Sequence, residues 1–364
     1  MHLWWLTNLD APYRRPVWSA LAERMPVSVG LTADRRSPDA QGRGEDWFDH
    51  HDDRYRSITL PVRRPRVGRR EVPVASSAAH RLLDDATHVV VGGWEAPVYW
   101  QLARHARRRG ARVVGFYEST ADSHTFRRGP VALARARWFR SLGAVVVPGA
   151  AAAAAVGSFG VPTERIHVGF NPVDVVSIAD AAARARASTS PGAGPVAGHR
   201  FVYVGQLIPR KNVDTLIRAF ARIATPQDSL AVVGDGSQRR RLEALSTELG
   251  AAVTFHGHLP ADQVAAAMAP HHTLVLPSTE EVWGLVANEA LAAGLQVVVS
   301  EQSGVAASLD GMPGVHRCPV PDEAGLTAAL TSARAAWGGW IQDPPILAHT
   351  PERFAELVWS ALDV

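Results

Sequence analysis

Short apolar runs rich in β-branched residues alternate with amphipathic stretches along the whole chain. In the first half, five apolar runs predict buried strands, and three stretches with helical periodicity lie between them. The strands are expected at 2–7, 27–32, 87–93, 111–117 and 143–149, and the helices at 15–25, 95–110 and 131–143. Apolar strands separated by helices are typical of a parallel sheet covered on both faces. Residues 33–74 are polar and contain prolines, and they predict at most one strand, near 56–62.

A second series of the same kind follows a change in composition, because residues 180–200 turn from a helix-like pattern into a linker rich in Ala, Ser, Gly and Pro. Strands are expected at 200–206, 229–236, 251–257, 272–278 and 295–300, and helices at 213–224, 237–250, 260–269, 285–294 and 351–362. The sequence therefore predicts an α/β protein with two doubly wound, Rossmann-like domains at 1–175 and 200–345. The linker is placed at 176–199, and the C-terminal segment 346–364 could pack back on the N-terminal domain.

Composition narrows the class of protein. The 364 residues are 46% hydrophobic and 20% charged, as in a globular protein of two domains. The single cysteine, Cys318, excludes an internal disulfide framework and favours a reducing compartment. The N-terminal apolar run is too short for a signal peptide, and the longest apolar stretch, 143–157, is interrupted by Pro148. We therefore expect a cytoplasmic protein with no transmembrane segment.

The net charge of +3 is only mildly basic. Three arginine-rich stretches, 63–70, 104–112 and 127–140, could contact an anionic membrane surface or an acidic substrate. Solvated helix faces are the favoured interpretation, so membrane association is expected to be peripheral at most. No aromatic residues interleave with the charges as nucleic-acid binding requires, and no nucleic-acid partner is expected.

The basic residues are arginine with one exception. Of the 38 Lys and Arg residues, only Lys211 is lysine. A position that keeps lysine against this bias suggests a need for a compact ammonium that the planar guanidinium cannot imitate, with chance as the alternative.

Candidate chemistry follows the strand ends of the second domain, where ligands of doubly wound sheets bind. The first strand runs into Gly205, Gln206, Arg210 and Lys211, and the second ends in a glycine turn at Gly234. The third is followed by His258 and Leu259, and the backbone of this loop could lie along the edge of a planar base. We expect the two domains to face each other across a cleft that contains the site.

The segment after the fourth strand is the most informative. Glu281 and Glu289 stand eight residues apart, and Trp283 and Gly284 precede a predicted helix that begins at Leu285. The first-turn amides of Leu285 and Val286 lack intrahelical partners and form an anion site without a metal. Two carboxylates on either side of an anion site suit a ligand built as polyol, phosphate and polyol. A nucleotide sugar has this layout.

The motifs "VGQLIPRKNVDTLIRAFA", "LAVVGDGSQRRRLEAL", "VTFHGHLP" and "VLPSTEEVWGLVANEALAAG" resemble those of retaining GT-B glycosyltransferases of family 4, with the E-x7-E signature at Glu281 and Glu289. The resemblance implies that Glu281 holds the donor sugar, Glu289 the ribose, and Lys211 the leaving diphosphate. It weakens in the first half, where residues 159–174 resemble the family's domain-closing segment.

Two positions depart from the family's pattern. Gln206 stands where an arginine is usual, and Arg210 could substitute for it. A histidine is usual after a central strand of the first domain, where this chain has Glu118 and Ser119, with His124 further on. Glu118 and His124 are therefore the candidate catalytic residues of that domain, beside Lys211 and Glu281 in the second.

We expect a metal-independent, retaining glycosyltransferase without a cofactor, with a nucleotide diphosphate sugar as co-substrate. UDP is the first expectation for the nucleotide, with GDP or dTDP next, and the acceptor is a small molecule, a saccharide or a lipid-linked saccharide. No G-x-G-x-x-G motif follows either first strand, which disfavours NAD, and adjacent residues such as "DHHDD" at 49–53 rarely converge on a metal. The alternatives are a catalytically silent sugar-nucleotide-binding subunit, a nucleotide-sugar epimerase, and a phosphorylase carrying pyridoxal phosphate on Lys211.

Overall fold

The computed structural model describes residues 1–33, 54–68, 70–121, 123–188 and 198–363. The chain divides into two compact units. The first unit comprises Met1–Pro172 together with Pro351–Val364, and the second comprises Val173–Thr350. The metal-like stretch 49–53 lies outside the described residues. No helix of the described residues has the length and apolarity needed to cross a bilayer.

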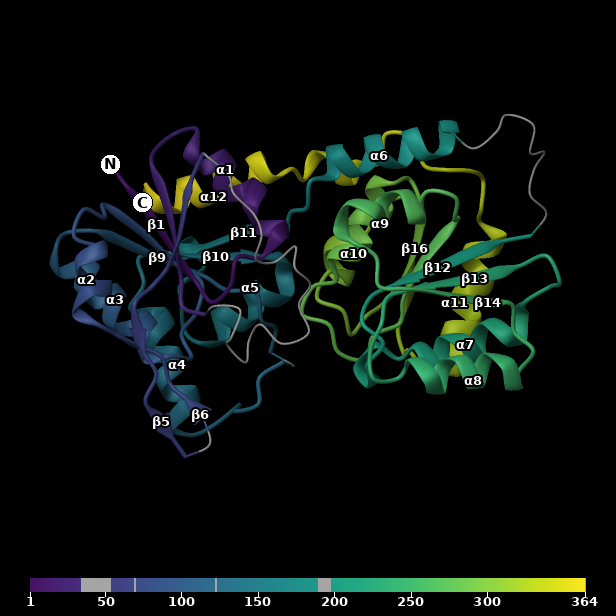
Figure 1. Ribbon diagram of the computed structural model, residues 1–364, viewed down its shortest axis with the longest axis horizontal. Helices are drawn as coiled ribbons and strands as arrows, with labels where there is room; N and C mark the ends of the chain where they lie inside the picture. The colour runs from purple at the N-terminus through teal and green to yellow at the C-terminus, as the bar shows by residue number, and fades with distance from the viewer. Residues whose placement is uncertain (34–53, 69, 122, 189–197, 364) are drawn as a thin grey trace. The chain divides into compact units, whose positions relative to one another are not determined.

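The first unit is built on a seven-stranded sheet whose paired strands are all parallel (Figure 1). Its strand order is β11-β10-β9-β8-β1-β2-β3, so the order reverses between β1 and β8. The strands are β1 Leu3–Thr7, β2 Val27–Leu31, β3 Arg56–Thr59, β8 His88–Val91, β9 Arg112–Phe116, β10 Val145–Pro148 and β11 Ile166–Gly169. The helices are α1 Arg15–Ala22, α2 Ser77–Leu82, α3 Pro97–Arg108, α4 Pro130–Arg140, α5 Gly149–Ser158 and α12 Pro351–Leu362.

Alternate residues of β1 enter two different cores, as the period of a strand requires. Leu3 and Trp5 pack with Trp18 of α1 on one face of the sheet. Trp4 and Leu6 belong to the core on the other face, which contains residues of α3, α4 and α5. The strand therefore reads as one continuous apolar run because both of its faces are buried.

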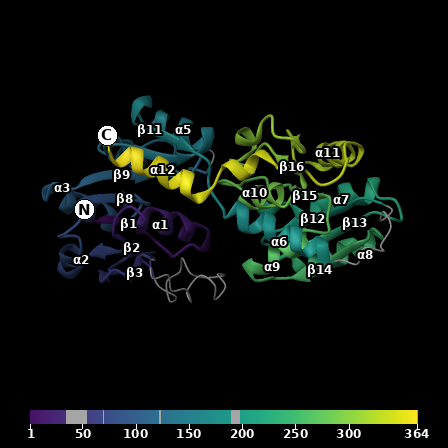
Figure 2. The ribbon, with the colours of Figure 1, turned by 90° about the horizontal axis from the view of Figure 1, so that it is seen from above.

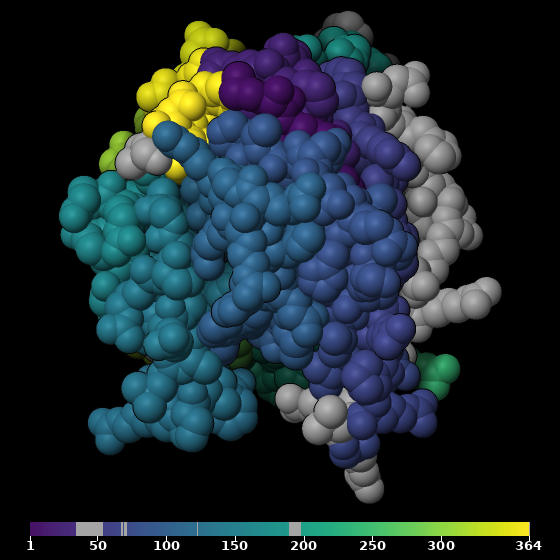
Figure 3. Space-filling model, turned by 90° about the vertical axis from the view of Figure 1, so that its left-hand side faces the viewer, coloured from purple at the N-terminus to yellow at the C-terminus, as the bar shows by residue number. Residues whose placement is uncertain are grey.

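The C-terminal helix α12 completes the first unit. It lies beside α1, and its residues Phe354, Val358 and Leu362 are buried in the same core as Leu3 and Trp5. Figures 2 and 3 show this helix, in yellow, against the purple N-terminal segment. The chain thus returns to its first unit after completing the second.

The second unit has a six-stranded parallel sheet with the order β14-β13-β12-β15-β16-β17. The order again reverses once, between β12 and β15. The strands are β12 Arg200–Val204, β13 Ser229–Val233, β14 Val253–Gly257, β15 Thr273–Leu276, β16 Gln296–Ser300 and β17 Val315–Cys318. The helices are α6 Val175–Ser188, α7 Val213–Ile223, α8 Arg239–Glu248, α9 Ala261–Met268, α10 Leu285–Ala292 and α11 Glu323–Ala335. Two doubly wound sheets confirm the predicted α/β fold class.

Two segments differ from the prediction. Residues 176–188, expected to belong to a linker, form most of α6, which packs against α9 and α10 and belongs to the second unit. Its alanines and arginines favour a helix, and tertiary packing supplies the rest of its stability. The boundary between the units therefore falls after Pro172 rather than after residue 175.

The segment expected to hold at most one strand contains more. After β3, the chain forms two short antiparallel pairs, which cover little apolar surface and so leave a weak pattern in the sequence. Their strands are β4 Val62–Arg63 with β7 Val74–Ala75, and β5 Arg66–Val67 with β6 Arg70–Glu71.

Candidate functional site

The topological switch point of the second sheet lies between β12 and β15. At such a point the connections leave in opposite directions and open a crevice beyond the carboxyl ends of the strands. Gly205 to Lys211 follow β12, and Glu281 to Gly284 follow β15. The structure therefore places most of the predicted donor-binding residues on the two loops where a ligand of this fold is expected.

The glycines of these loops are required by close backbone approach. A Cβ on Gly234 would lie 1.9 Å from the carbonyl oxygen of Gly205, and Gly234 has a φ of 134° that other residues rarely adopt. The Gly205 amide donates to the carbonyl of Val233 (3.0 Å), and the Gly234 amide donates to that of Gly257 (2.7 Å). The loops that follow β12, β13 and β14 are thus joined through their backbones into one edge.

Lys211 and Glu281 form an ion pair at this edge. Lys211 ends the 3-10 helix Pro209–Lys211 after β12, and Glu281 lies in the loop after β15. Each side chain is only 13% exposed, so the pair is partly desolvated. The backbone of Glu281 is further fixed by an isolated parallel β-bridge to Ser303. The structure brings together two of the residues whose joint role the sequence predicted.

Asn212 positions Lys211, and the sequence reasoning did not single it out. Its backbone is left-handed, with a φ of 58°, at the turn where the 3-10 helix passes into α7. Its amide group donates to the carbonyls of Pro277 (3.1 Å) and Pro321 (2.6 Å), which ties the loop after β12 to the loops after β15 and β17. The preference of asparagine for helix starts and left-handed backbone is the signal that could have found it.

Arg210 and Gln206 are both exposed beside Lys211. The Arg210 guanidinium donates to the carbonyl of Glu280 (3.1 Å), and the Arg210 carbonyl accepts the amide of Thr279 (2.9 Å). The backbone carbonyl of Gln206 accepts a hydrogen bond from the hydroxyl of Tyr203 (2.9 Å), and the residue itself is exposed. Arg210 therefore crosses to the loop after β15, whereas Gln206 contributes through its backbone.

Helix α10 begins at Leu285, where the sequence predicted it. Gly284 precedes it in a left-handed conformation with a φ of 103°, and a Cβ there would lie 2.6 Å from Leu276 Cδ2. The amides of Leu285 and Val286 are at the positive end of the helix dipole, where an anion is stabilised. The Trp283 side chain, by contrast, is 3% exposed, so its ring belongs to the interior of the unit.

Glu289 lies about one turn into α10 and is partly buried. Burial raises the pKa of its carboxyl group to about 7, because water that would solvate the charge is excluded. A carboxyl group in this state gains most from ligand hydroxyls that donate hydrogen bonds to it. His258 is exposed and Leu259 partly buried in the loop after β14.

The two candidates in the first unit are both engaged at the carboxyl end of β9. Glu118 is ion-paired with Arg14, and its Oε1 also accepts the side-chain amide of Asn171 (2.9 Å). His124 Nε2 and the Tyr117 hydroxyl are 2.5 Å apart. The guanidinium and the amide hold the Glu118 carboxylate in place, which favours a positioning role for Glu118. All other predicted site residues belong to the second unit.

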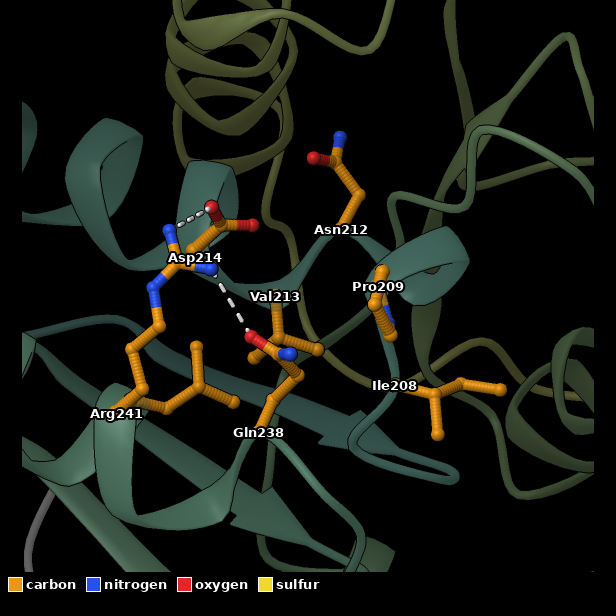
Figure 4. Close-up of a pocket in the computed structure, with 8 residues that line it drawn as sticks. Ile208, Pro209, Asn212, Val213, Asp214, Gln238 and Arg241 are labelled. Atoms are coloured by element: carbon orange, nitrogen blue, oxygen red, sulfur yellow. Dashed lines mark hydrogen bonds and ion pairs between the residues drawn. The ribbon is translucent and has the colours of Figure 1, made fainter.

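A small polar cavity of about 180 Å³ opens beside the 3-10 helix that carries Lys211 (Figure 4). It lies between the start of α7 and the start of α8, and Arg241 crosses it to pair with Asp214 (3.3 Å) and to donate to Gln238 (3.0 Å). Its charges are thus compensated within the protein. None of the predicted site residues lines it.

The two doubly wound sheets define the GT-B class of fold. Residues 195–310, which lie in the second unit, match the family "Glycosyl transferases group 1". The family resemblance seen in the sequence is confirmed there, while its retaining family 4 subgroup stays a prediction.

Curated relatives match over part of their length. The chain is 37% identical to glycogen synthase of Mycobacterium tuberculosis over 181 residues, which are 48% of this chain and 41% of that protein. It is 32% identical to the GDP-mannose-dependent alpha-mannosyltransferase of the same organism over 208 residues, 55% of this chain and 51% of that protein. The chain thus matches about half or less of the length of these relatives.

Solved structures match over the whole chain. Sucrose-phosphate synthase from Thermosynechococcus elongatus has a TM-score of 0.68 at 19% identity, covering 100% of this chain and 95% of that one. The Anabaena protein HepE in complex with UDP has a TM-score of 0.72 at 17% identity, covering 100% of both chains. At this identity the likeness concerns the fold.

Proposed function

We propose that this protein is a metal-independent, retaining glycosyltransferase that moves a sugar from a nucleotide diphosphate sugar to a hydroxyl group of an acceptor. The observation that carries the proposal is the Lys211–Glu281 pair at the switch point of the second sheet, next along the chain to the amino end of α10. Such an edge offers a cation and backbone amides to a diphosphate and carboxylates to the hydroxyls on either side of it.

The proposed donor follows from the chemistry of the cation, the helix amides and the two carboxyl groups. The amides of Leu285 and Val286, with Lys211, would hold the diphosphate. Glu289 would accept hydrogen bonds from the ribose hydroxyls, and Glu281 from the sugar hydroxyls. UDP is the preferred nucleotide, and it is supported by the Anabaena protein HepE, which has the same fold and is known with UDP and with UDP-glucose. GDP is the alternative nucleotide, and the similarity to a GDP-mannose-dependent mannosyltransferase supports it.

The reaction needs no nucleophile from the protein. The bond between the anomeric carbon and the leaving phosphate oxygen breaks, and the acceptor oxygen bonds to the anomeric carbon on the same face. The acceptor proton passes to the departing phosphate oxygen, so the charge gained by the diphosphate is what the protein must stabilise. Lys211 and the α10 amides supply that stabilisation from fixed positions, which is the largest contribution that such a site makes.

The test is a panel of UDP-, GDP- and dTDP-sugars incubated with the protein in the presence of EDTA. The proposal expects release of nucleoside diphosphate from at least one donor, slowly with water and faster with an acceptor. The anomeric configuration of the transferred sugar, followed by NMR, should match that of the donor. Loss of activity in EDTA would contradict the metal-independent mechanism, and inversion would contradict the retaining one.

A catalytically silent sugar-nucleotide-binding subunit is the second candidate. It is favoured by the exposed Gln206 in place of the family's arginine, and by the ion pair with Arg14 that engages Glu118 at the position where the family has histidine. Tight binding of a donor without hydrolysis or transfer, over the whole panel and with several acceptors, would support this candidate. A change in the sugar without release of the nucleotide would indicate an epimerase.

A further inference from the structure

Among the described residues of the first unit, two arginines are almost fully buried, and one of the two has a carboxylate partner. Arg14 is 6% exposed and pairs with Glu118. Arg135, on α4, is 5% exposed, and no carboxylate of the described part of the chain lies within ion-pair distance of it. Its guanidinium donates to the carbonyl of Phe126 (3.0 Å), while its buried Nε has no hydrogen-bond partner.

Aromatic rings surround the Arg135 guanidinium. Its central carbon lies 4.9 Å from the ring centroid of Phe159 and 5.5 Å from that of Trp94. Tyr117 packs edge-on against Phe159, and burial raises the pKa of its phenol to about 12, so it stays neutral and supplies no counter-charge. Glu95, the acid next to Trp94, is exposed and accepts the Trp94 amide instead (3.0 Å).

The position of the guanidinium is as informative as its lack of a partner. Trp94 follows β8, the strand at the switch point of the first sheet, and Tyr117 follows β9 beside it. The carboxyl edge of a doubly wound sheet is where its ligand binds. Trp94 is partly exposed, so one wall of the cluster is open to solvent.

A buried cation without a counter-ion costs folding free energy, because the aromatic rings and the single carbonyl that face Arg135 replace only part of its lost hydration. We propose that Arg135 is the anion-binding residue of an acceptor site in the first unit, and that the acceptor is a saccharide or polyol bearing a phosphate or carboxylate group. The guanidinium fork binds either anion through two parallel hydrogen bonds. The ring of Trp94 would cover the apolar face of the sugar. This inference rests on the proposed function only in calling the ligand an acceptor.

The test measures anion binding while UDP occupies the second unit. Protein saturated with UDP is titrated by calorimetry with inorganic phosphate, glucose 6-phosphate, glucuronate and glucose. We expect at least one of the two anionic sugars to bind at least about 10-fold more tightly than glucose, as for a hydrogen-bonded charge. Arg135→Met should abolish that preference and phosphate binding. Arg137→Met, which removes an exposed arginine of the same helix, should leave both unchanged.

Equal binding of glucose and the anionic sugars by the wild-type protein would overturn the inference, and this comparison holds even if Arg135→Met does not fold. An equal loss of preference in Arg137→Met would also overturn it, because it would show a diffuse effect of positive charge. Failure of UDP to bind counts against the proposed function, and the two arginine variants then still decide the question of the first unit.

Discussion

The ammonium of Lys211 is ion-paired with the carboxylate of Glu281, and each side chain is 13% exposed. The carboxylate of Glu281 is thus paired with the ammonium of Lys211, the cation that a donor diphosphate would require. Under the proposed function, a donor would displace Glu281 from Lys211, and the freed carboxylate would become available to the hydroxyls of the donor sugar. In this proposal, donor binding exchanges the partner of each group: Lys211 changes from Glu281 to the diphosphate, and Glu281 changes from Lys211 to the sugar hydroxyls.

Lys211→Ala removes the cation and is expected to lower turnover of the donor by about 100-fold or more. Lys211→Arg keeps the charge but replaces a compact ammonium by a planar fork, so it should recover only part of the rate. The measurement is kcat/KM for release of nucleoside diphosphate. Arg218→Ala, which removes an exposed cation of α7, is the matched control and should retain the wild-type rate.

Glu281→Gln should separate binding from turnover. Without the carboxylate, Lys211 is free for the diphosphate, and the affinity for UDP is expected to rise by about 5-fold, equivalent to about 1 kcal/mol. Turnover of the sugar nucleotide should fall by about 100-fold, because the grip on the sugar hydroxyls is weakened. Calorimetry with UDP and the turnover assay check the two effects. Glu280→Gln changes the exposed neighbour and should alter neither; a UDP affinity that falls in Glu281→Gln would refute the exchange.

Glu289 makes stability depend on pH. The pKa of its carboxyl group is raised from 4.5 to about 7 by burial, so the folded protein holds this proton more tightly than the unfolded chain. The contribution of the protonated group is therefore complete below pH 4.5 and is lost as the pH rises to about 7. At pH 8, Glu289→Gln is expected to be more stable than wild type by about 1–3 kcal/mol. Urea unfolding at pH 5 and pH 8 tests this, with the exposed Glu248→Gln as control.

Asn212 offers a test of how Lys211 is positioned. Asn212→Ala loses two hydrogen bonds to loop carbonyls and puts alanine, which tolerates left-handed backbone less well than asparagine, at this position, so a loss of about 2–4 kcal/mol in unfolding free energy is expected. Asn212→Gly loses the same bonds but tolerates the backbone, and should be more stable than the alanine variant by about 1 kcal/mol. Both should bind UDP more weakly than wild type. Equal stability of the two variants would show that the backbone conformation carries no cost.

Much of the fold follows from local pattern. The fully buried strand β16 and the start of α10 at Leu285 were predicted because apolar runs and a preceding glycine mark them directly. Strand β17 was not predicted, and α6 was predicted only as a helix-like start of the linker. The sequence of β17 has no continuous apolar run, since it lies at the sheet edge, and α6 buries only Val175 and Ala182. Such elements are stabilised by neighbours far away in the sequence.

The site was predictable in its residue types but not in its contacts. The spacing of Glu281 and Glu289 and the single lysine pointed to the sheet edge after β12 and β15, yet no pattern indicates that Lys211 pairs with Glu281. The same holds for Arg14, whose contact with Glu118 changes the role expected of that carboxylate. Ion pairs between distant segments depend on tertiary geometry, which the sequence does not display.

The most direct measurement is a crystal structure of the protein with UDP. The account predicts the diphosphate oxygens within hydrogen-bond distance of the Leu285 and Val286 amides and of Lys211 Nζ, with the ribose hydroxyls on the carboxylate of Glu289. Glu281 should have left Lys211. UDP bound away from α10, or a diphosphate with no contact to Lys211, would contradict the account.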